Sequence, residues 1–243
     1  MRHALVFGAT GGIGQAICEK LAADGFSLYI HYAHQKDAAI ILQKSLQIQY
    51  PQQEFFVVSL NMTALLPEDL LIFSQQIFAL DTIVFAQGNS WYGLTSEMPA
   101  EIMTNLWRLH LETPIRILQL FEKKLAQAPF ARVIFIGSIY GQTGSAMEAV
   151  YASVKAAQVG FCKSYAKEVA TLGITVNVVA PGAVQTPLLK DFTTEEITDL
   201  KENIPVLRLA APAEIAFFVQ MIAHKEASYL TGSLVSVDGA WNG

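Results

Sequence analysis

The sequence predicts a doubly wound α/β fold, in which a parallel sheet of about seven strands carries helices on both faces. Short apolar runs alternate with longer segments of helical periodicity along the whole chain, as strands and helices do in such folds. Most of the runs are continuously apolar, as expected for strands that are buried on both faces of a parallel sheet. A glycine-rich turn joins the first run to the first helical segment.

The individual elements follow from these runs in order. The expected strands are residues 4–7, 27–32, 54–59, 82–86, 132–136, 174–179 and 234–237. The expected helices are residues 13–23, 36–49, 67–77, 99–126, 150–172 and 213–223. No linker and no block of charge interrupts the alternation, so we expect residues 1–243 to form a single domain.

The segment 183–212 is the most irregular part of the chain. It follows Pro181-Gly182, contains the helix-start pattern Thr193-Thr194-Glu195-Glu196 and ends at Pro212. That pattern is of the capping-box type. A region of this length inside a compact domain is commonly functional, and we expect it to form a substrate lid.

Composition excludes several classes of function. The net charge is −5 and the sequence pI is about 5.5, without any run of Lys and Arg, so a nucleic-acid partner is not expected. No apolar run approaches the roughly 18 residues that a membrane span needs, and the N-terminus is not of the signal-peptide type, so we expect a cytoplasmic protein. Cys18 and Cys162 lie in helical patterns and, with five scattered histidines, suggest no metal site. Hydrophobic residues make up 52%, and we expect part of this apolar surface to be covered in a homo-oligomer, a dimer or a tetramer.

The turn between the first strand and the first helix has the composition of a phosphate-binding loop. Glycines let the backbone approach a pyrophosphate without Cβ clashes, and the N–H groups at a helix start attract its negative charge. We therefore expect a dinucleotide here; the alternative is a tight turn without a ligand. The expected contacts are Gly8, Thr10, Gly11, Gly12, Ile13 and Gly14.

The end of the second strand indicates which dinucleotide is bound. An acidic residue usually binds the adenosine ribose there when the cofactor is NAD, but the segment reads Ile30-His31-Tyr32-Ala33-His34-Gln35-Lys36. His31, His34 and Lys36 could instead meet a 2′-phosphate, so NADP(H) is preferred over NAD(H). The alternative is that both histidines are solvated loop residues.

The pattern Tyr151-Ala-Ser-Val-Lys155 carries the chemistry. Tyr and Lys at this spacing lie one turn apart on one helix face. A phenol titrates near ~10 in water, and a neighbouring ammonium lowers that pKa toward neutrality. Ser138 stands 13 residues earlier, just after the fifth strand, where its hydroxyl can bond both a substrate carbonyl and the phenol. A chance helical pair is the alternative, which the serine and the glycine turn disfavour.

These motifs resemble the short-chain dehydrogenase/reductase family, whose members have a Rossmann-type fold. Asn177-Val-Val-Ala-Pro-Gly182 with Thr186, and the closing Val237-Asp238-Gly239, extend the similarity over essentially the whole chain. The resemblance implies that Tyr151 is the acid/base, that Lys155 binds the nicotinamide ribose and tunes Tyr151, and that Ser138 orients the carbonyl. Further cofactor contacts implied are Tyr32, Asn61, Met62, Ala86, Gln87, Gly88, Tyr151, Lys155, Pro181, Gly182, Val184 and Thr186.

The chain departs from the family pattern at several positions. Phe7 replaces the usual Thr before the first glycine, Asn61 replaces an adenine-binding Asp, and Phe85-Ala86-Gln87-Gly88 replaces Asn-Asn-Ala-Gly. His110 stands where the family has a catalytic Asn that supports a water relay to the lysine. Histidine can accept and donate protons, so we expect His110 to take part in the relay; the alternative is a helix-packing role.

The substrate is less well defined by the sequence. Residues 173–182 are similar to 3-oxoacyl-acyl-carrier-protein reductases, whereas His110, Glu148 and the ending Asp238-Gly-Ala-Trp241 are more similar to the subgroup that reduces a 5-aminopentanone group on elongation factor P. Glu148 precedes Tyr151 by three residues and would favour a cationic substrate, unless it is a solvent-facing loop residue. Trp91 is a candidate wall of the substrate pocket.

The sequence therefore predicts an NADP(H)-dependent carbonyl reductase that acts on a ketone, either free or held on a protein or acyl carrier. A catalytically silent NADP(H) sensor or scaffold is the alternative from another class, although such relatives typically lose the Tyr or the Lys.

Overall fold

Seven parallel strands form one sheet in the order β3-β2-β1-β4-β5-β6-β7, in a computed structural model that describes residues 2–190 and 192–241. The strands are β1 (Arg2–Phe7), β2 (Phe26–Tyr32), β3 (Phe55–Ser59), β4 (Thr82–Phe85), β5 (Ala131–Ile136), β6 (Ile174–Pro181) and β7 (Leu234–Val237). All seven were predicted, and both the parallel Rossmann-type sheet and its size are confirmed.

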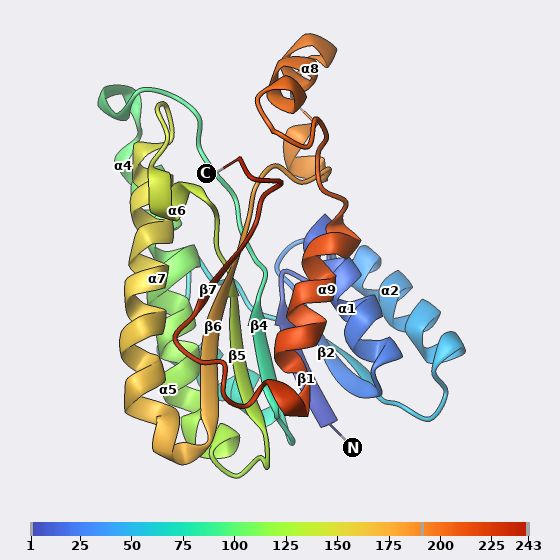
Figure 1. The fold of residues 1–243 in the computed structure, drawn as a ribbon. Coiled ribbons are helices and arrows are strands. Elements are labelled where there is room, and N and C mark those ends of the chain that lie inside the picture. Colours follow the sequence, from blue (N-terminus) through green and yellow to red (C-terminus); the bar gives the residue numbers. More distant parts are fainter. Residues whose placement is uncertain (1, 191, 242–243) are drawn as a thin grey trace.

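Helices cover both faces of the sheet, with α1, α2 and α9 on one side and α4, α5 and α7 on the other (Figure 1). The α-helices are α1 (Gly12–Ala23), α2 (Lys36–Gln49), α3 (Pro67–Gln75), α4 (Ala100–Trp107), α5 (Thr113–Leu125), α6 (Tyr140–Thr143), α7 (Ala149–Val169), α8 (Thr194–Glu202) and α9 (Pro212–Ala223). Short 3₁₀ turns lie at Thr95–Glu97, Ala170–Leu172, Pro187–Leu189 and Lys225–Ala227. No helix of the described residues is both long and apolar enough to cross a membrane.

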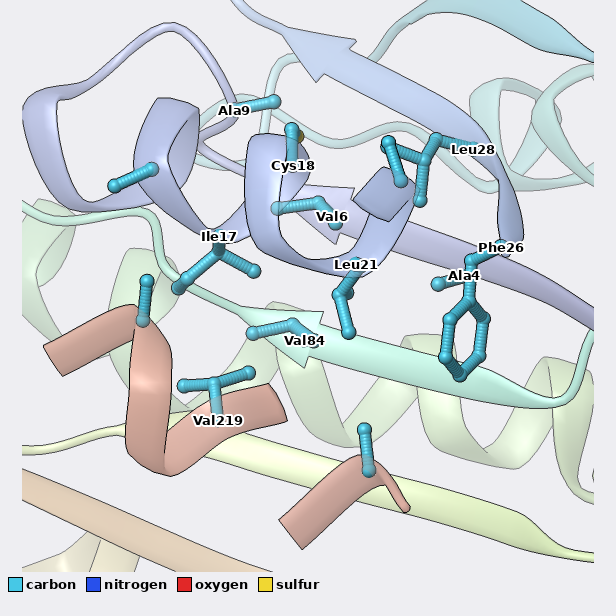
Figure 2. Close-up of a cluster of buried hydrophobic side chains, with 14 of the residues drawn as sticks. Ala4, Val6, Ala9, Ile17, Cys18, Leu21, Phe26, Leu28, Val84 and Val219 are labelled. Atoms are coloured by element: carbon cyan, nitrogen blue, oxygen red, sulfur yellow. The ribbon is translucent and has the colours of Figure 1, made fainter. Parts of the chain in front are cut away.

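The sheet separates two hydrophobic cores. On one face, Ile17 and Leu21 of α1 pack with Val6, Leu28 and Val219 from β1, β2 and α9 (Figure 2). On the other face, side chains of α3, α5 and α7 pack around a row of stacked phenylalanines that includes Phe7, Phe85 and Phe135. Each fully buried large apolar side chain stabilises the fold by about 1.5–3 kcal/mol. The central strands have continuous apolar runs because both of their faces are buried in these cores.

The expected helix 99–126 is not continuous. A π-helical turn, Arg108–Glu112, separates α4 from α5. A π-turn widens the helix and disturbs its regular hydrogen bonds, and such turns are frequent at functional sites. The turn contains His110, which hydrophobic periodicity alone would have placed on a regular helix.

The segment expected to be a lid contains a 3₁₀ turn and α8. Thr193 and Glu196 form the predicted capping box, in which each side chain bonds the backbone N–H of the other residue. Helix α8 buries none of its residues and stands beyond the carboxyl ends of the strands, apart from the sheet (Figure 1).

Candidate active site

The candidate residues gather at the carboxyl edge of the sheet. Strand β1 lies between β2 and β4, so the chain proceeds in opposite directions from the two sides of β1. This reversal creates the crevice in which open α/β sheets bind ligands. The glycine turn follows β1, and the loops after β4, β5 and β6 supply the other candidates.

The glycine turn is closely packed and cannot hold larger residues at two positions. Gly8 has φ +69°, and a Cβ there would lie 2.6 Å from the backbone of Gln87. A Cβ on Gly14 would lie 2.0 Å from the carbonyl oxygen of Gly8. The backbone N–H of Gly11 donates to that same oxygen at 3.0 Å. The turn therefore brings bare backbone and the N-terminus of α1 to the sheet edge, a suitable cradle for a pyrophosphate.

The end of β6 and the loop after it contact both the loop after β5 and the glycine turn. Ile139 donates its N–H to the Pro181 carbonyl at 3.1 Å, and a Cβ on Gly12 would lie 3.1 Å from Cγ2 of Thr186. Val184, two residues before Thr186, is buried. The expected cofactor contacts from the glycine turn and from residues 181–186 therefore lie side by side.

His31 is not available to bind a 2′-phosphate, which corrects the expectation for this residue. Its ring is 2% exposed; Nδ1 accepts the N–H of Gly8 at 3.2 Å, and Nε2 bonds the Leu60 carbonyl at 2.9 Å. Burial lowers the pKa of His31 to about 4, so the ring is neutral near pH 7 and carries no charge for a phosphate. His31 instead anchors the glycine turn, while Tyr32 is partly buried and His34 and Lys36 are exposed.

The residues expected to contact the adenine side of the cofactor differ in how exposed they are. Asn61 is exposed, and its Oδ1 accepts the N–H and the hydroxyl of Thr63 at 3.1 and 3.0 Å. Met62 is buried, so its side chain supports the loop. Gln87 is buried and donates to the Leu109 carbonyl at 3.0 Å, whereas Ala86 is partly buried and Gly88 is exposed.

The three predicted catalytic side chains lie at the carboxyl end of β5 and the start of α7: Ser138, Tyr151 and Lys155. The Lys155 Nζ lies 5.5 Å from the centroid of the Tyr151 ring and donates to the Ile136 carbonyl at 2.9 Å. The Ser138 hydroxyl lies close enough to Tyr151 to lower the pKa of its phenol. Ser138 Oγ also accepts the N–H of Tyr140 at 3.2 Å. The three groups that the sequence singled out therefore occupy one place in the fold.

The ionisation of this cluster differs from the expectation. Burial, then the nearby carboxylate of Glu148, raise the pKa of Tyr151, and the Ser138 hydroxyl opposes them. Burial lowers the pKa of Lys155 to about 7. The ammonium was expected to pull the phenol pKa down, but Nζ bonds the Ile136 carbonyl, and loss of hydration dominates. Tyr151 consequently remains a protonated phenol near neutral pH.

His110 lies against the tyrosine. It is fully buried, its ring centroid is 5.7 Å from that of Tyr151 in an edge-to-face arrangement, and Nε2 bonds the Asn89 carbonyl at 3.0 Å. Burial, then the charge of Lys155, hold the pKa of His110 well below its usual value. The imidazole of His110 is therefore neutral, and it lies close enough to Tyr151 and Lys155 to influence their environment.

Glu148 and Trp91 lie in two adjacent loops. Glu148 is the N-cap residue of α7 and is partly buried; burial raises the pKa of its carboxyl group, and no ion pair with it occurs among the described residues. Trp91 packs under Gly93, whose N–H donates to the Met147 carbonyl at 2.8 Å. The loop that carries Trp91 is thus bonded directly to the loop that carries Glu148.

A sequence model of the short chain dehydrogenases matches residues 2–197. The chain belongs to the short-chain dehydrogenase/reductase family. It is therefore an oxidoreductase of the CH–OH/C=O class. Among curated relatives, it is 35% identical over 241 residues to the oxidoreductase YmfI of Bacillus subtilis (strain 168), covering 99% of both chains.

The chain is also similar to three other reductases. The chain is 33% identical to the 3-oxoacyl-[acyl-carrier-protein] reductase FabG of Vibrio cholerae, covering 97% of this chain and 95% of that protein. The angucycline C-6 ketoreductase LanV with bound NADP superposes with a TM-score of 0.89 at 26% identity, covering 99% and 95% of the two chains. L-sorbose reductase from Gluconobacter frateurii, in complex with NADPH and L-sorbose, gives 0.90 at 26% identity, covering 98% and 95%.

Two residues near the candidate site of this family member escaped the sequence analysis. Tyr140 lies on α6 with its ring centroid 6.0 Å from that of Trp241, and Glu148 is close enough to raise the Tyr140 pKa, after burial. Gln158 is buried on α7 and donates to the His110 carbonyl at 2.6 Å. Gln158 could have been found as a polar residue at i+7 from Tyr151, whereas the contact of Tyr140 with Trp241 joins residues far apart in the sequence. In the part of the chain that the structure describes, no group of three or more His, Cys, Asp or Glu could hold a metal ion.

Proposed function

We propose that this protein is an NADP(H)-dependent carbonyl reductase in which Tyr151 donates the proton. The observation that carries the proposal is the meeting of Ser138, Tyr151 and Lys155 at the sheet edge that also carries the glycine turn. When bound, the nicotinamide supplies the hydride for the carbonyl carbon. Ser138 holds the carbonyl oxygen while negative charge develops on it, and Tyr151 gives that oxygen its proton.

The residues around the glycine turn fit the cofactor. Bare backbone at Gly8–Gly14 and the N-terminus of α1 would hold the pyrophosphate, where a Cβ at Gly8 or Gly14 would clash with backbone. Residues 181–186 would also contact the cofactor, because Thr186 lies against Gly12 of this turn. Lys155 is close enough to Tyr151 to bind a ribose hydroxyl beside the reacting atoms.

A phosphorylated cofactor suits the end of β2. No acidic residue occurs in residues 30–36, and His34 and Lys36 are exposed there. Their side chains are the candidates for binding the 2′-phosphate, because the His31 ring is buried. The bound NADP of LanV and the NADPH of L-sorbose reductase agree with this preference.

The direction of the pKa of Tyr151 favours reduction. A proton donor must be protonated before it reacts, and burial raises the pKa of this phenol. The enzyme therefore begins the reduction with Tyr151 in the required form throughout the neutral range.

A 3-oxoacyl thioester is the first candidate substrate. The similarity to FabG extends over 97% of this chain, and the β-keto group of such a substrate has the carbonyl that the site needs. Segment 183–212, with its unburied α8, serves in this proposal as a lid that covers the acyl chain.

An amino-ketone is the second candidate, because of Glu148. This carboxylate is partly buried beside Tyr151, and no cationic side chain pairs with it among the residues described. A partly buried carboxylate that lacks a cation attracts a positively charged ligand and repels an acidic carrier. The 5-aminopentanone group on elongation factor P has this charge.

Turnover on the two ketones tests the proposal. Purified protein is given acetoacetyl thioester or elongation factor P that bears 5-aminopentanone, each with NADPH and with NADH, and cofactor oxidation is followed. We expect turnover on one ketone, with NADPH preferred. Glu148→Gln should weaken use of the amino-ketone and should not weaken use of the thioester, because the lost carboxylate repels an acidic carrier. NADPH binding without oxidation on any ketone would instead indicate the sensor or scaffold.

We also propose a homo-oligomer. Met103 and Trp107 of α4 are 43% and 40% exposed, which leaves large apolar groups in water on an outer helix. Analytical ultracentrifugation tests this, with a monomer at micromolar concentration as the contrary result.

A further inference from the structure

Gln158 extends the row of functional side chains on α7. Tyr151, Lys155 and Gln158 recur at i, i+4 and i+7 and therefore share one face of the helix. Gln158 is 1% exposed, although burying an amide is costly unless its hydrogen bonds are made. An apolar residue would be the ordinary choice at such a position.

The amide of Gln158 contacts the π-turn that carries His110. Its Nε2 donates to the His110 carbonyl at 2.6 Å, and Nε2 of Gln87 donates to the neighbouring Leu109 carbonyl at 3.0 Å. A π-turn disturbs the regular bonding of such carbonyls. Two side chains from distant parts of the chain therefore hold two successive carbonyls of one turn.

The π-turn Arg108–Glu112 presents the His110 ring to Tyr151. Because the Asn89 carbonyl can only accept, Nε2 of His110 carries the proton, and Nδ1 keeps its lone pair. Nδ1 is buried and has no hydrogen-bond partner among the described residues. The imidazole is therefore held in one tautomer, with a free acceptor, edge-to-face with the Tyr151 ring.

This arrangement is not the one that stability alone would select. Besides Nδ1 of His110, Oε1 of Gln158 and Oε1 of Gln87 are buried without a donor in the described part of the chain. Burying an acceptor without a protein donor is costly. All three atoms belong to residues that meet at one turn.

We infer that Gln158 is a positioning residue of the reductase, which holds the π-turn through the His110 carbonyl and thereby fixes the imidazole against Tyr151. The inference rests on the proposed role of Tyr151 as proton donor. Gln158 acts through His110, so its contribution must disappear when the imidazole is removed.

A double-mutant cycle tests the inference on the full chain. Gln158→Met keeps the length of the side chain and removes the donor, and we expect kcat on the ketone to fall about tenfold, because a small misplacement of a reacting group is costly. KM for NADPH should not change. In the His110→Phe background, Gln158→Met should have no further effect on kcat. Should Gln158→Met fail to fold, Gln158→Asn, which keeps the amide but not its reach, takes its place with the same expectation.

Gln43→Met is the matched control. Gln43 makes the same kind of contact, an amide that donates to the Phe55 carbonyl at 2.6 Å, but on α2, and kcat should be unchanged. An unchanged kcat in Gln158→Met, or an equal loss with and without His110, overturns the inference while wild-type turnover preserves the proposed function. A wild type that reduces neither ketone overturns both.

Discussion

The two halves of the candidate site differ in how completely their polar groups are paired. On the nucleotide side, formed by Gly8–Gly14 and His31, both ring nitrogens of the histidine have partners, and the turn bonds itself through backbone. On the proposed reaction side, formed by Ser138, Tyr151, Lys155, His110 and Gln158, buried acceptors of His110 and Gln158 have no donor within residues 2–190 and 192–241. Three groups with shifted pKa values, Tyr151, Lys155 and His110, also gather there.

This difference follows from what each side has to do. A pyrophosphate is recognised by fixed backbone N–H groups, and a rigid cradle needs every internal bond satisfied. A proton donor needs neighbours that alter its ionisation, which requires burial of ionisable groups. The proposed nucleotide side is therefore rigid, whereas the proposed reaction side gathers ionisable groups, and substitutions on either side test this contrast.

The largest expected effect is that of Tyr151→Phe. Loss of the hydroxyl removes the proposed proton donor, and we expect kcat to fall about 10²–10⁴-fold, the range of general acid catalysis. NADPH affinity, measured by fluorescence titration, should be retained because the nucleotide side is untouched.

Tyr165→Phe is the control for that variant. Tyr165 lies on the same helix, and its hydroxyl donates to Glu122 at 2.9 Å. Neither Tyr165 nor Glu122 belongs to the reaction side. It should keep wild-type kcat. Full activity in Tyr151→Phe would remove the basis of the proposed mechanism.

The next effect is on stability and comes from Lys155→Met. The folded-state pKa of Lys155 is about 7, below its ordinary 10.5, so between these pH values the unfolded chain binds more protons. Stability of the wild type therefore rises with pH across this window. Removing the buried ammonium should raise the free energy of unfolding more at pH 6 than at pH 10, by on the order of a few kcal/mol.

Urea titrations at several pH values measure this difference. Lys163→Met, at an exposed lysine of the same helix, should show no comparable pH dependence relative to the wild type. A stability difference between Lys155→Met and the wild type that stays constant from pH 6 to pH 10 would contradict the burial of a costly charge on the reaction side.

A smaller effect is expected from His31→Phe on the nucleotide side. The variant loses the bonds to the Gly8 N–H and the Leu60 carbonyl, which should destabilise the fold by about 1–3 kcal/mol and weaken NADPH binding. His31→Gln, whose amide can donate and accept, should restore part of both. Wild-type NADPH affinity in His31→Phe, measured by isothermal titration, would show that the anchor is not needed.

The smallest effect belongs to Lys36→Ala. An exposed charge pair contributes about 0.2–1 kcal/mol, so KM for NADPH should rise by no more than about fivefold and KM for NADH should not change. Lys44→Ala, also exposed on α2, serves as the control. An equal rise for both cofactors would argue against contact with the 2′-phosphate.

The sequence alone determined the order of the strands along the chain, the glycine turn and the spacing of Ser138, Tyr151 and Lys155. Each of these is a local property: apolar runs identify strands, and i, i+4 spacing on a helix brings two side chains to one face. The local signals also located the capping box at Thr193 and Glu196.

Only the tertiary structure decided what these groups can do. His31 looked like a phosphate ligand until the fold buried its ring between Gly8 and Leu60, and Lys155 lost the effect expected on the Tyr151 pKa because burial outweighs its charge. Gln158 meets His110 across 48 residues of chain. Burial and pairing over such separations depend on how whole helices pack, which local spacing does not encode.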